Sequence, residues 1–231
     1  MPCAAIILTG GNGSRITEIG YPKQFYEILY KPVFVHTLEI YEYMPEIDDI
    51  YLVINQSYSD KYHEVLQKYT FRKLRKLIPG GATRQESVEN AVLSIKNTEM
   101  VVIQDGADPT THPEGIRECI KTAEKEGACT AFASARHTVV KISGNEIESV
   151  LDRELLGYTV APQVYRFELV LSAITNARKN NLTNKSIVEL VKEVNHKVVV
   201  VPSKYENIKI TRPEDLIIVE QILKKRNHVY A

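Results

Sequence analysis

The sequence has no excess of charge of either sign, because 29 lysine and arginine residues balance 29 aspartate and glutamate residues. Binding nucleic acid or an anionic membrane over a large surface requires clustered excess cations. The balance therefore predicts neither a nucleic-acid partner nor a membrane partner. It remains compatible with one local cationic pocket.

Cysteine is scarce: the three residues are Cys3, Cys119 and Cys129. Their number is odd, their spacing is wide and no CxxC pair occurs, which disfavours a zinc site and a disulfide framework. We expect reduced thiols in a cytoplasmic protein, most simply as small buried apolar side chains.

Long hydrophobic runs are also missing. The longest run near the start, residues 4–8, is far too short to span a bilayer. It has neither a basic leader nor a small-residue cleavage site, so we expect no signal peptide. Without repeats, low-complexity tracts or Gly/Ser linkers, the 231 residues predict a single domain over 1–231.

Short β-branched runs alternate with longer amphipathic stretches, which predicts an α/β fold with a mostly parallel sheet and helices on both faces. The predicted strands cover residues 3–9, 50–54, 76–79, 100–104, 128–133 and 197–201. The predicted helices cover residues 33–43, 59–69, 84–96, 113–126, 167–180, 186–194 and 213–225.

One segment, at about residues 138–159, interrupts this alternation. It consists of two short extended pieces around Ser143-Gly144-Asn145, which is a hairpin turn signal. A hairpin that protrudes from an α/β domain has edges to cover, so we expect a β-arm insertion that contacts a partner subunit.

A glycine-rich loop, Thr-Gly-Gly-Asn-Gly-Ser-Arg at residues 9–15, follows the first predicted strand. Glycines there let backbone amides close on an anion, and a following helix start adds positive potential. The loop is not a Walker loop, because no Gly-Lys-Ser/Thr follows at the required spacing. It is not a dinucleotide fingerprint either, since Ile16 replaces the third glycine and the second strand ends at Asn55 rather than an acid.

Two cations near this loop, Arg15 and Lys23, favour phosphate chemistry over a plain tight turn. Joining two phosphates brings anions together, and charge develops on the attacked phosphorus and on the leaving pyrophosphate. Fixed cations in a dry site stabilise that charge more than they stabilise the ground state. The alternative is a pair of solvated surface cations.

A second glycine motif, Gly-Gly-Ala-Thr-Arg-Gln-Glu-Ser-Val at residues 80–88, leads from a predicted strand into a helix. Its backbone groups could contact the edge of a base, with Arg84 and Ser87 assisting. The alternative is an ordinary helix start with Thr83 as N-cap.

Two further segments place charged side chains beside predicted strands. An apolar strand ends in Asp105-Gly106, and a carboxylate at the carboxyl end of a strand is well placed to hold Mg²⁺ on nucleotide phosphates. The alternative is a turn-forming Asp-Gly pair. Lys209 lies on a short extended run before a helix that begins at Pro213, and spacing alone does not decide whether it faces a site or solvent.

Taken together, these segments resemble the 2-C-methyl-D-erythritol 4-phosphate cytidylyltransferase family and its sister family, the ribitol-5-phosphate cytidylyltransferases. The resemblance covers nearly the whole chain. Its motifs follow the family's order: the glycine loop with Arg15, Pro22-Lys23-Gln24-Phe25, Gly80-Gly81 with Arg84 and Ser87, Asp105-Gly106-Ala107, Asp152-Arg153 and residues 207–216. It implies a Rossmann-like sheet, a β-arm that builds a homodimer, and Mg²⁺-dependent transfer of CMP from CTP to a small polyol phosphate with release of pyrophosphate.

The resemblance also implies roles for individual residues. Arg15 and Lys23 would stabilise the transition state, while Arg153 and Lys209 would orient the attacking phosphate. The metal ligand would be Asp105. The nucleotide would be held by Gly10, Gly11, Gly13, Ser14, Gly81, Ala82, Arg84, Ser87 and Gly106. The acceptor would contact Asp108, Arg136, His137 and Thr138, with Thr138 and Arg153 contributed by the neighbouring subunit.

The chain departs from the family pattern mainly on the acceptor side. Asp108 stands where the family usually has arginine, and Arg136-His137-Thr138 stands where it has Arg-Asp-Thr. Elsewhere, Ala161-Pro162-Gln163 replaces Thr-Pro-Gln and Thr183-Asn184-Lys185 replaces Thr-Asp-Asp. Because a carboxylate near a phosphate monoester is repulsive, we hypothesise that Asp108 pairs with His137 and that the pocket accepts a different polyol.

Three alternatives therefore accompany the leading acceptor, 2-C-methyl-D-erythritol 4-phosphate of isoprenoid precursor synthesis. The first is ribitol 5-phosphate or another polyol phosphate for cell-wall or capsule synthesis. The second is a nucleotide-binding homologue without turnover. The third, a sugar-1-phosphate nucleotidyltransferase, fits the glycine loop but not residues 207–216.

Overall fold

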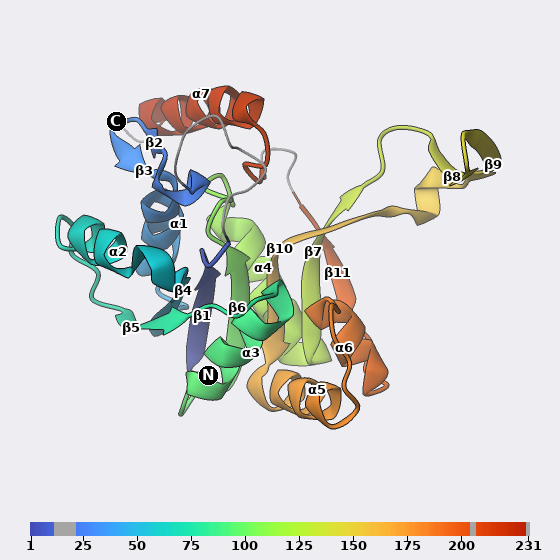
Figure 1. The fold of residues 1–231 in the computed structure, drawn as a ribbon, viewed down its shortest axis with the longest axis horizontal. Coiled ribbons are helices and arrows are strands. Elements are labelled where there is room, and N and C mark those ends of the chain that lie inside the picture. The colour runs from blue at the N-terminus through green and yellow to red at the C-terminus, as the bar shows by residue number, and fades with distance from the viewer. Residues whose placement is uncertain (12–21, 204–206, 230–231) are drawn as a thin grey trace.

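A computed structural model of the chain describes residues 1–11, 22–203 and 207–229. Its centre is a seven-stranded sheet of order β11-β7-β10-β6-β1-β4-β5 (Figure 1). The strands are β1 (Cys3–Leu8), β4 (Asp49–Ile54), β5 (Leu74–Pro79), β6 (Met100–Asp105), β7 (Ala128–Ser134), β10 (Gly157–Arg166) and β11 (Val199–Pro202). Every pairing is parallel except those of β10, which runs antiparallel to β6 and β7. The predicted α/β fold with a mostly parallel sheet is confirmed.

Helices cover both faces of the sheet because its central strands are apolar on both sides. In β1, Cys3, Ala5 and Ile7 belong to one core cluster, whereas Ala4 and Ile6 belong to another. The first cluster includes side chains of α1 (Val33–Glu42), α2 (Ser59–Leu66) and α4 (Pro113–Glu126). The second includes side chains of α3 (Arg84–Ser94), α5 (Phe167–Lys179) and α6 (Ile187–Glu193).

The last helix, α7 (Pro213–Val229), lies above the carboxyl-terminal edge of the sheet (Figure 1). It packs Leu216 and Val219 against Ile28 and Val33, beside the small ribbon of β2 (Glu27–Ile28) and β3 (Lys31–Pro32). All seven predicted helices are present, and α4 matches its predicted bounds at both ends. The three cysteines are free and buried, as expected.

Strand β10 was not predicted, and its sequence carries a proline near its middle. Proline cannot donate to a β-ladder, so Pro162 argues against a central strand. The structure accommodates Pro162 at a register shift between Val160 and Gln163 in the pairing with β7. The prediction also assigned residues 157–159 to the arm, but they belong to β10.

The arm itself is a hairpin of β8 (Val139–Ser143) and β9 (Glu146–Leu151), paired antiparallel. Gly144 in its turn has a φ of +59°, a value that glycine adopts without strain. The hairpin extends well away from the rest of the molecule (Figure 1). Within the described ranges, no helix is both long and apolar enough to cross a membrane.

Candidate active site

The carboxyl ends of β1, β5 and β6 meet at one edge of the sheet and open into a cleft of about 360 Å³. Parallel strands bring the segments that follow them to the same edge, which is where open α/β sheets bind ligands. Three segments far apart in sequence converge here: residues 9–11, 81–87 and 105–107. Lys23 and Lys209 line the same cleft.

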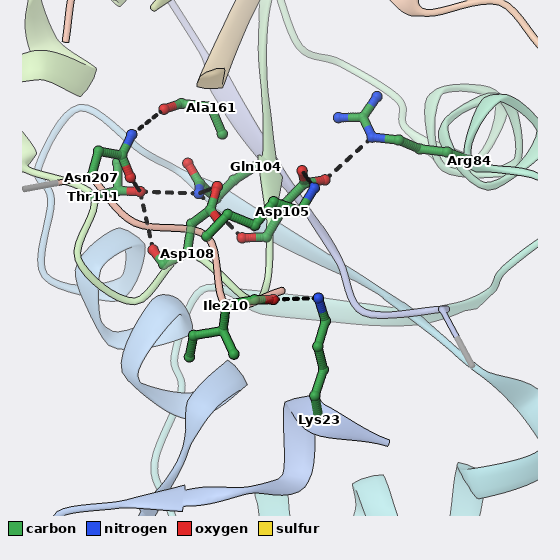
Figure 2. Close-up of polar contacts among 10 residues, drawn as sticks. Lys23, Arg84, Gln104, Asp105, Asp108, Thr111, Ala161, Asn207 and Ile210 are labelled. Atoms are coloured by element: carbon green, nitrogen blue, oxygen red, sulfur yellow. Dashed lines mark hydrogen bonds and ion pairs between the residues drawn. The ribbon is translucent and has the colours of Figure 1, made fainter. Parts of the chain in front are cut away.

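In the segment Pro22-Lys23-Gln24-Phe25, three side chains make different contacts. Gln24 is buried, and its Nε2 donates to the carbonyls of Thr9 (2.9 Å) and Gly11 (3.2 Å), which holds the described start of the glycine loop. Phe25 packs in the core with its ring 4.6 Å from that of Tyr62. Lys23 donates to the carbonyl of Ile210 and faces the cleft (Figure 2). The segment therefore shapes the loop and delivers a cation beside it.

The second glycine segment is a close packing point as well as a helix start. A Cβ atom at Gly81 would overlap the side chain of Glu86, so only glycine fits there. Thr83 caps α3 by accepting from the amide of Glu86 at 3.1 Å, and the Glu86 carboxylate accepts from the amide of Ala82 at 2.8 Å. Ser87 Oγ accepts from the amide of Gly81 (3.0 Å) and donates to the carbonyl of Thr83 (2.9 Å). Ser87 thus stabilises the loop that forms one wall of the cleft.

Asp105, at the end of β6, lies between two cations. Arg84 Nε is 3.3 Å from Oδ1, and Lys209 Nζ donates to Oδ2 (Figure 2 shows the Arg84 contact). Burial by itself would raise the pKa of Asp105, but Arg84 and Lys209 outweigh burial and hold that pKa below its ordinary value. The group is therefore a carboxylate flanked by a guanidinium and an ammonium.

The loop that carries Lys209 is held on both sides of that residue. The amide of Ile208 donates to Thr110 Oγ1 (2.8 Å), and the amide of Ile210 donates to the carbonyl of Ala107 (2.9 Å). Asn207 Nδ2 donates to the carbonyl of Ala161 at 2.6 Å, which connects the loop to β10 (Figure 2). The sequence did not decide whether the side chain of Lys209 faces the site or solvent. With its loop held in this way, Lys209 lines the cleft.

A second cavity, of about 310 Å³, adjoins the first. Arg84, Asp105 and Lys209 line both cavities, whereas Asp108 and Gln163 line only the second. Asp108 is 3% exposed, and burial raises its pKa to about 8, with the Asp105 carboxylate adding to the rise. Arg84, Asp105 and Lys209 therefore lie where the two cavities meet.

Most predicted nucleotide and catalytic residues within the described ranges come together in the first cleft. Those that line it are Gly10, Gly11, Lys23, Gly81, Ala82, Arg84, Ser87, Asp105 and Lys209. Gly13, Ser14 and Arg15 lie outside the described residues. Gly106 lines neither cavity, and its nucleotide contact stays a prediction; a Cβ atom there would overlap the Thr9 side chain, so the glycine also serves close packing.

The predicted acceptor residues of the arm lie outside both cavities of the single chain. These are Arg136, His137, Thr138 and Arg153. Arg153 Nη1 donates to the carbonyl of Arg136 at 3.4 Å. The hypothesised pair of Asp108 and His137 does not form within the described part of one chain: Asp108 is buried and contacts Gln104, whereas His137 is exposed on the arm.

The cleft could bind a metal cation through one carboxylate, that of Asp105. Across the ranges that the structure describes, no group of three or more His, Cys, Asp or Glu residues is arranged to hold a metal. Mg²⁺ commonly binds one or two carboxylates and takes its other ligands from water and substrate phosphates. The hard oxygen ligand Asp105, which faces the cleft, fits that mode of binding.

Several residues that shape the site were not among the predicted site residues. Gln24, Gln104, Thr111 and Gln163 are buried polar side chains that contact the loops or line the second cavity. The sequence offered one hint, a glutamine at the end of an apolar run. Such a glutamine is expected to be buried, and a buried polar side chain needs a hydrogen-bond partner. Its partners come from distant segments, so only the folded chain identifies them.

The chemistry that this arrangement supports is transfer between two phosphorylated ligands. Backbone loops and the amino-terminal end of α3 line one cavity, and the two cavities share two cations and a carboxylate. Cations at such a junction stabilise negative charge that develops when two anions react.

Comparison with known proteins agrees with this reading of the site. The family model described as 2-C-methyl-D-erythritol 4-phosphate cytidylyltransferase matches residues 3–225. The chain is 37% identical over 226 residues to the protein of that name from Clostridium tetani, covering 97% of this chain and 92% of that protein. It is 35% identical over 222 residues to the protein of that name from Dehalococcoides mccartyi, covering 96% of each.

Solved structures show the same relationship. The crystal structure of 4-diphosphocytidyl-2C-methyl-D-erythritol synthase from Anaerococcus prevotii superposes with a TM-score of 0.84 at 26% identity, covering 96% of both chains. That of the 2-C-methyl-D-erythritol 4-phosphate cytidylyltransferase from Francisella tularensis superposes with a TM-score of 0.80 at 25% identity, covering 96% of this chain and all of the other. The match of the family model over nearly the whole chain and the identity to curated relatives agree with the converging motifs. This chain belongs to the 2-C-methyl-D-erythritol 4-phosphate cytidylyltransferase family.

Proposed function

We propose that this enzyme transfers CMP from CTP to the phosphate of 2-C-methyl-D-erythritol 4-phosphate and releases pyrophosphate, a step of isoprenoid precursor synthesis. The observation that carries the proposal is that two adjoining cavities share Arg84, Asp105 and Lys209. CTP occupies the cavity lined by the glycine segments, and the acceptor occupies the cavity beside β10. Their phosphates then meet at the shared cations.

The reaction is a displacement at the α-phosphorus of CTP. An oxygen of the acceptor phosphate forms a bond to that phosphorus, and the bond from the phosphorus to the oxygen bridging to the β-phosphate breaks. The electron pair of the broken bond leaves with pyrophosphate. Lys23 and Lys209 stabilise the negative charge that develops on the α-phosphate and on the leaving pyrophosphate. They can do so because their positions are held before the substrates bind. Arg15 has the same predicted role.

Mg²⁺ is part of the proposal, with Asp105 as its protein ligand. When bound, the ion neutralises phosphate charge and helps to orient the triphosphate. Asp105 faces the cleft and keeps its negative charge because the pKa of its carboxyl group is lowered. In the absence of the ion, Arg84 and Lys209 balance the charge of Asp105.

Pyrophosphate release tests the activity directly. The purified protein is incubated with Mg²⁺, each nucleoside triphosphate in turn, and one acceptor at a time: methylerythritol phosphate, ribitol 5-phosphate or a sugar 1-phosphate. We expect release with CTP and methylerythritol phosphate, at a kcat/KM at least about tenfold above every other pair. A higher kcat/KM with ribitol 5-phosphate would assign the acceptor to the sister family. No release with any pair would indicate a binding protein without turnover.

We also propose that the enzyme is a cytoplasmic homodimer built by the arm. The hairpin exposes large apolar side chains, among them Ile142 (67%), Ile147 (65%) and Val150 (66%). Such a patch on a protruding hairpin is typical of an interface. Dimerisation would bring Thr138 and Arg153 of one subunit to the acceptor cavity of the other. The three buried free thiols are compatible with a reducing compartment.

Replacing Ile142 and Ile147 together by glutamate is expected to separate the subunits, because two buried charges without partners are costly at an interface. Light scattering after gel filtration should give twice 26.2 kDa for the wild type and 26.2 kDa for the variant. Turnover should fall by about 100-fold, since Arg153 no longer reaches a neighbouring site.

Ile217→Glu is the matched control, because Ile217 is 66% exposed on α7, away from the arm. It should leave both the mass and the turnover unchanged. A wild-type protein of 26.2 kDa with full turnover would contradict the dimer.

A further inference from the structure

The loop that carries Lys209 is hydrogen-bonded to the segment that follows β6. The amide of Ile208 donates to Thr110 Oγ1 at 2.8 Å. The amide of Ile210 donates to the carbonyl of Ala107 at 2.9 Å. Lys209 therefore lies between two backbone amides that are both held by the same segment, which is the one that continues from the strand of the cleft carboxylate.

Thr110 supplies the side-chain partner in this pairing. Its residue is fully buried, and it lines neither of the two cavities that the proposed function assigns to the substrates. Its hydroxyl oxygen accepts from the amide directly before Lys209. A backbone amide that is withdrawn from water needs a partner. If the hydroxyl were removed, the loop would have to shift to satisfy the Ile208 amide in another way.

The helix that follows the loop holds Thr110 from another side. Near the end of α7, Arg226 Nη2 donates to the carbonyl of Thr110 at 2.7 Å. At the start of the helix, Asp215 Oδ2 accepts from the amides of Thr211 (2.7 Å) and Arg212 (2.8 Å). The loop is thus fixed after Lys209 by the first turn of α7, and before it by a threonine that the last part of α7 supports.

The position of this backbone matters because burial alone does not fix the Lys209 side chain. That side chain is 40% exposed, and its ammonium group donates to Asp105. A long lysine side chain has many rotamers, so the backbone position and the contact with Asp105 together decide where the ammonium group lies. A displacement of about 1 Å in a group that acts on the reacting atoms can lower a rate by about 100-fold.

We propose that Thr110 is a positioning residue for the transfer reaction. Its hydroxyl group fixes the backbone next to Lys209 and thereby places the ammonium group where the two cavities meet, while Arg226 supports Thr110 from the far end of α7. This inference rests on the proposed function, and it adds two residues that line neither substrate cavity.

The test begins with two substitutions of Thr110. Thr110→Val keeps the shape of the side chain but removes the hydroxyl, whereas Thr110→Ser keeps the hydroxyl. In the pyrophosphate assay, Thr110→Val should lower kcat by about 10- to 100-fold and change the KM for CTP by less than about twofold, because Lys209 acts in the transition state. Thr110→Ser should stay within about threefold of the wild-type kcat.

The decisive measurement repeats Thr110→Val in a Lys209→Met enzyme. If Thr110 acts through Lys209, there is no ammonium group left to displace, so kcat should fall by less than about twofold further. Hydrogen exchange measured by mass spectrometry gives a readout that needs no turnover. The amide of Ile208 should exchange at least about tenfold faster in Thr110→Val than in the wild type.

Thr130→Val is the matched control for Thr110→Val. Thr130 is a buried threonine on β7 whose Oγ1 lies 3.2 Å from the carbonyl oxygen of Ala131, and it lines neither cavity. The control should leave both kcat and the exchange of the Ile208 amide as in the wild type.

A substitution at the other end of the contact tests the same inference. Arg226→Met should lower kcat in the same direction as Thr110→Val, by about three- to tenfold, and by less than about twofold in the Lys209→Met enzyme. Lys224→Met is its control, since Lys224 is 45% exposed on the same helix and pairs with Glu220. If Thr110→Val does not fold, as circular dichroism will show, the Arg226 series decides the question.

Four outcomes would overturn the inference. They are a wild-type kcat in folded Thr110→Val, a Thr110→Ser enzyme as slow as Thr110→Val, an equal loss from Thr110→Val with and without Lys209, and an equal loss in Thr130→Val. A wild-type enzyme that releases no pyrophosphate would refute the proposed function instead. The exchange of the Ile208 amide would then still show whether Thr110 holds the loop.

Discussion

A Lys23→Met enzyme is expected to lose about 10²- to 10³-fold in kcat, because one fixed cation near the reacting phosphates is removed. Lys23 faces the cleft and donates to the carbonyl of Ile210, so its ammonium group is held before substrate binds. Methionine keeps much of the length of the side chain but has no charge. The loss should appear mainly in kcat, since charge develops in the transition state. Pyrophosphate release at saturating CTP and acceptor measures it.

Lys68→Met is the matched control for this substitution. Lys68 is exposed, and its ammonium forms an (i, i+4) ion pair with Glu64, 3.2 Å away. Exposed pairs contribute little, so this variant should be as active as the wild type. If Lys23→Met changes only the KM for CTP and leaves kcat intact, Lys23 contributes to ground-state binding and has no special role in the transition state.

The second large effect is expected for Asp105→Asn, which should lower kcat by about 10³-fold and raise the Mg²⁺ concentration for half-maximal activity. Asparagine keeps the shape of the side chain but removes the negative charge that we propose as the ligand of the ion. It also removes the shared counter-ion of Arg84 and Lys209, so Lys209 is held less firmly. Titrating Mg²⁺ in the pyrophosphate assay measures both effects.

Thermal stability should change little in this variant. Arg84 and Lys209 are 41% and 40% exposed, so water can solvate them once Asp105 has lost its charge. Asp60→Asn, an exposed change in the first turn of α2, should leave the Mg²⁺ dependence as in the wild type. An Asp105→Asn enzyme with wild-type Mg²⁺ dependence would show that another group binds the ion.

The sequence could predict the layers of the fold because the periodicity of its apolar residues is local. Residues 113–126 form an amphipathic stretch that begins with a proline, and these local signals placed α4 correctly. The same reasoning failed at β10, since Pro162 is an unfavourable local choice that only the register shift beside β7 makes acceptable. Local rules cannot anticipate a strand whose irregularity is accommodated by its neighbours.

The sequence alone also indicated which segments gather at the candidate site, because glycines, cations and acids at strand ends are visible as residue types. Tertiary structure decided how they combine. Whether Lys209 faced solvent or the site depended on hydrogen bonds to Thr110 and Ala107, about a hundred positions away. Whether Asp108 pairs with His137 depended on where the arm points. Contacts between distant segments leave no local pattern in a single sequence, so the second cavity became visible only in the folded chain.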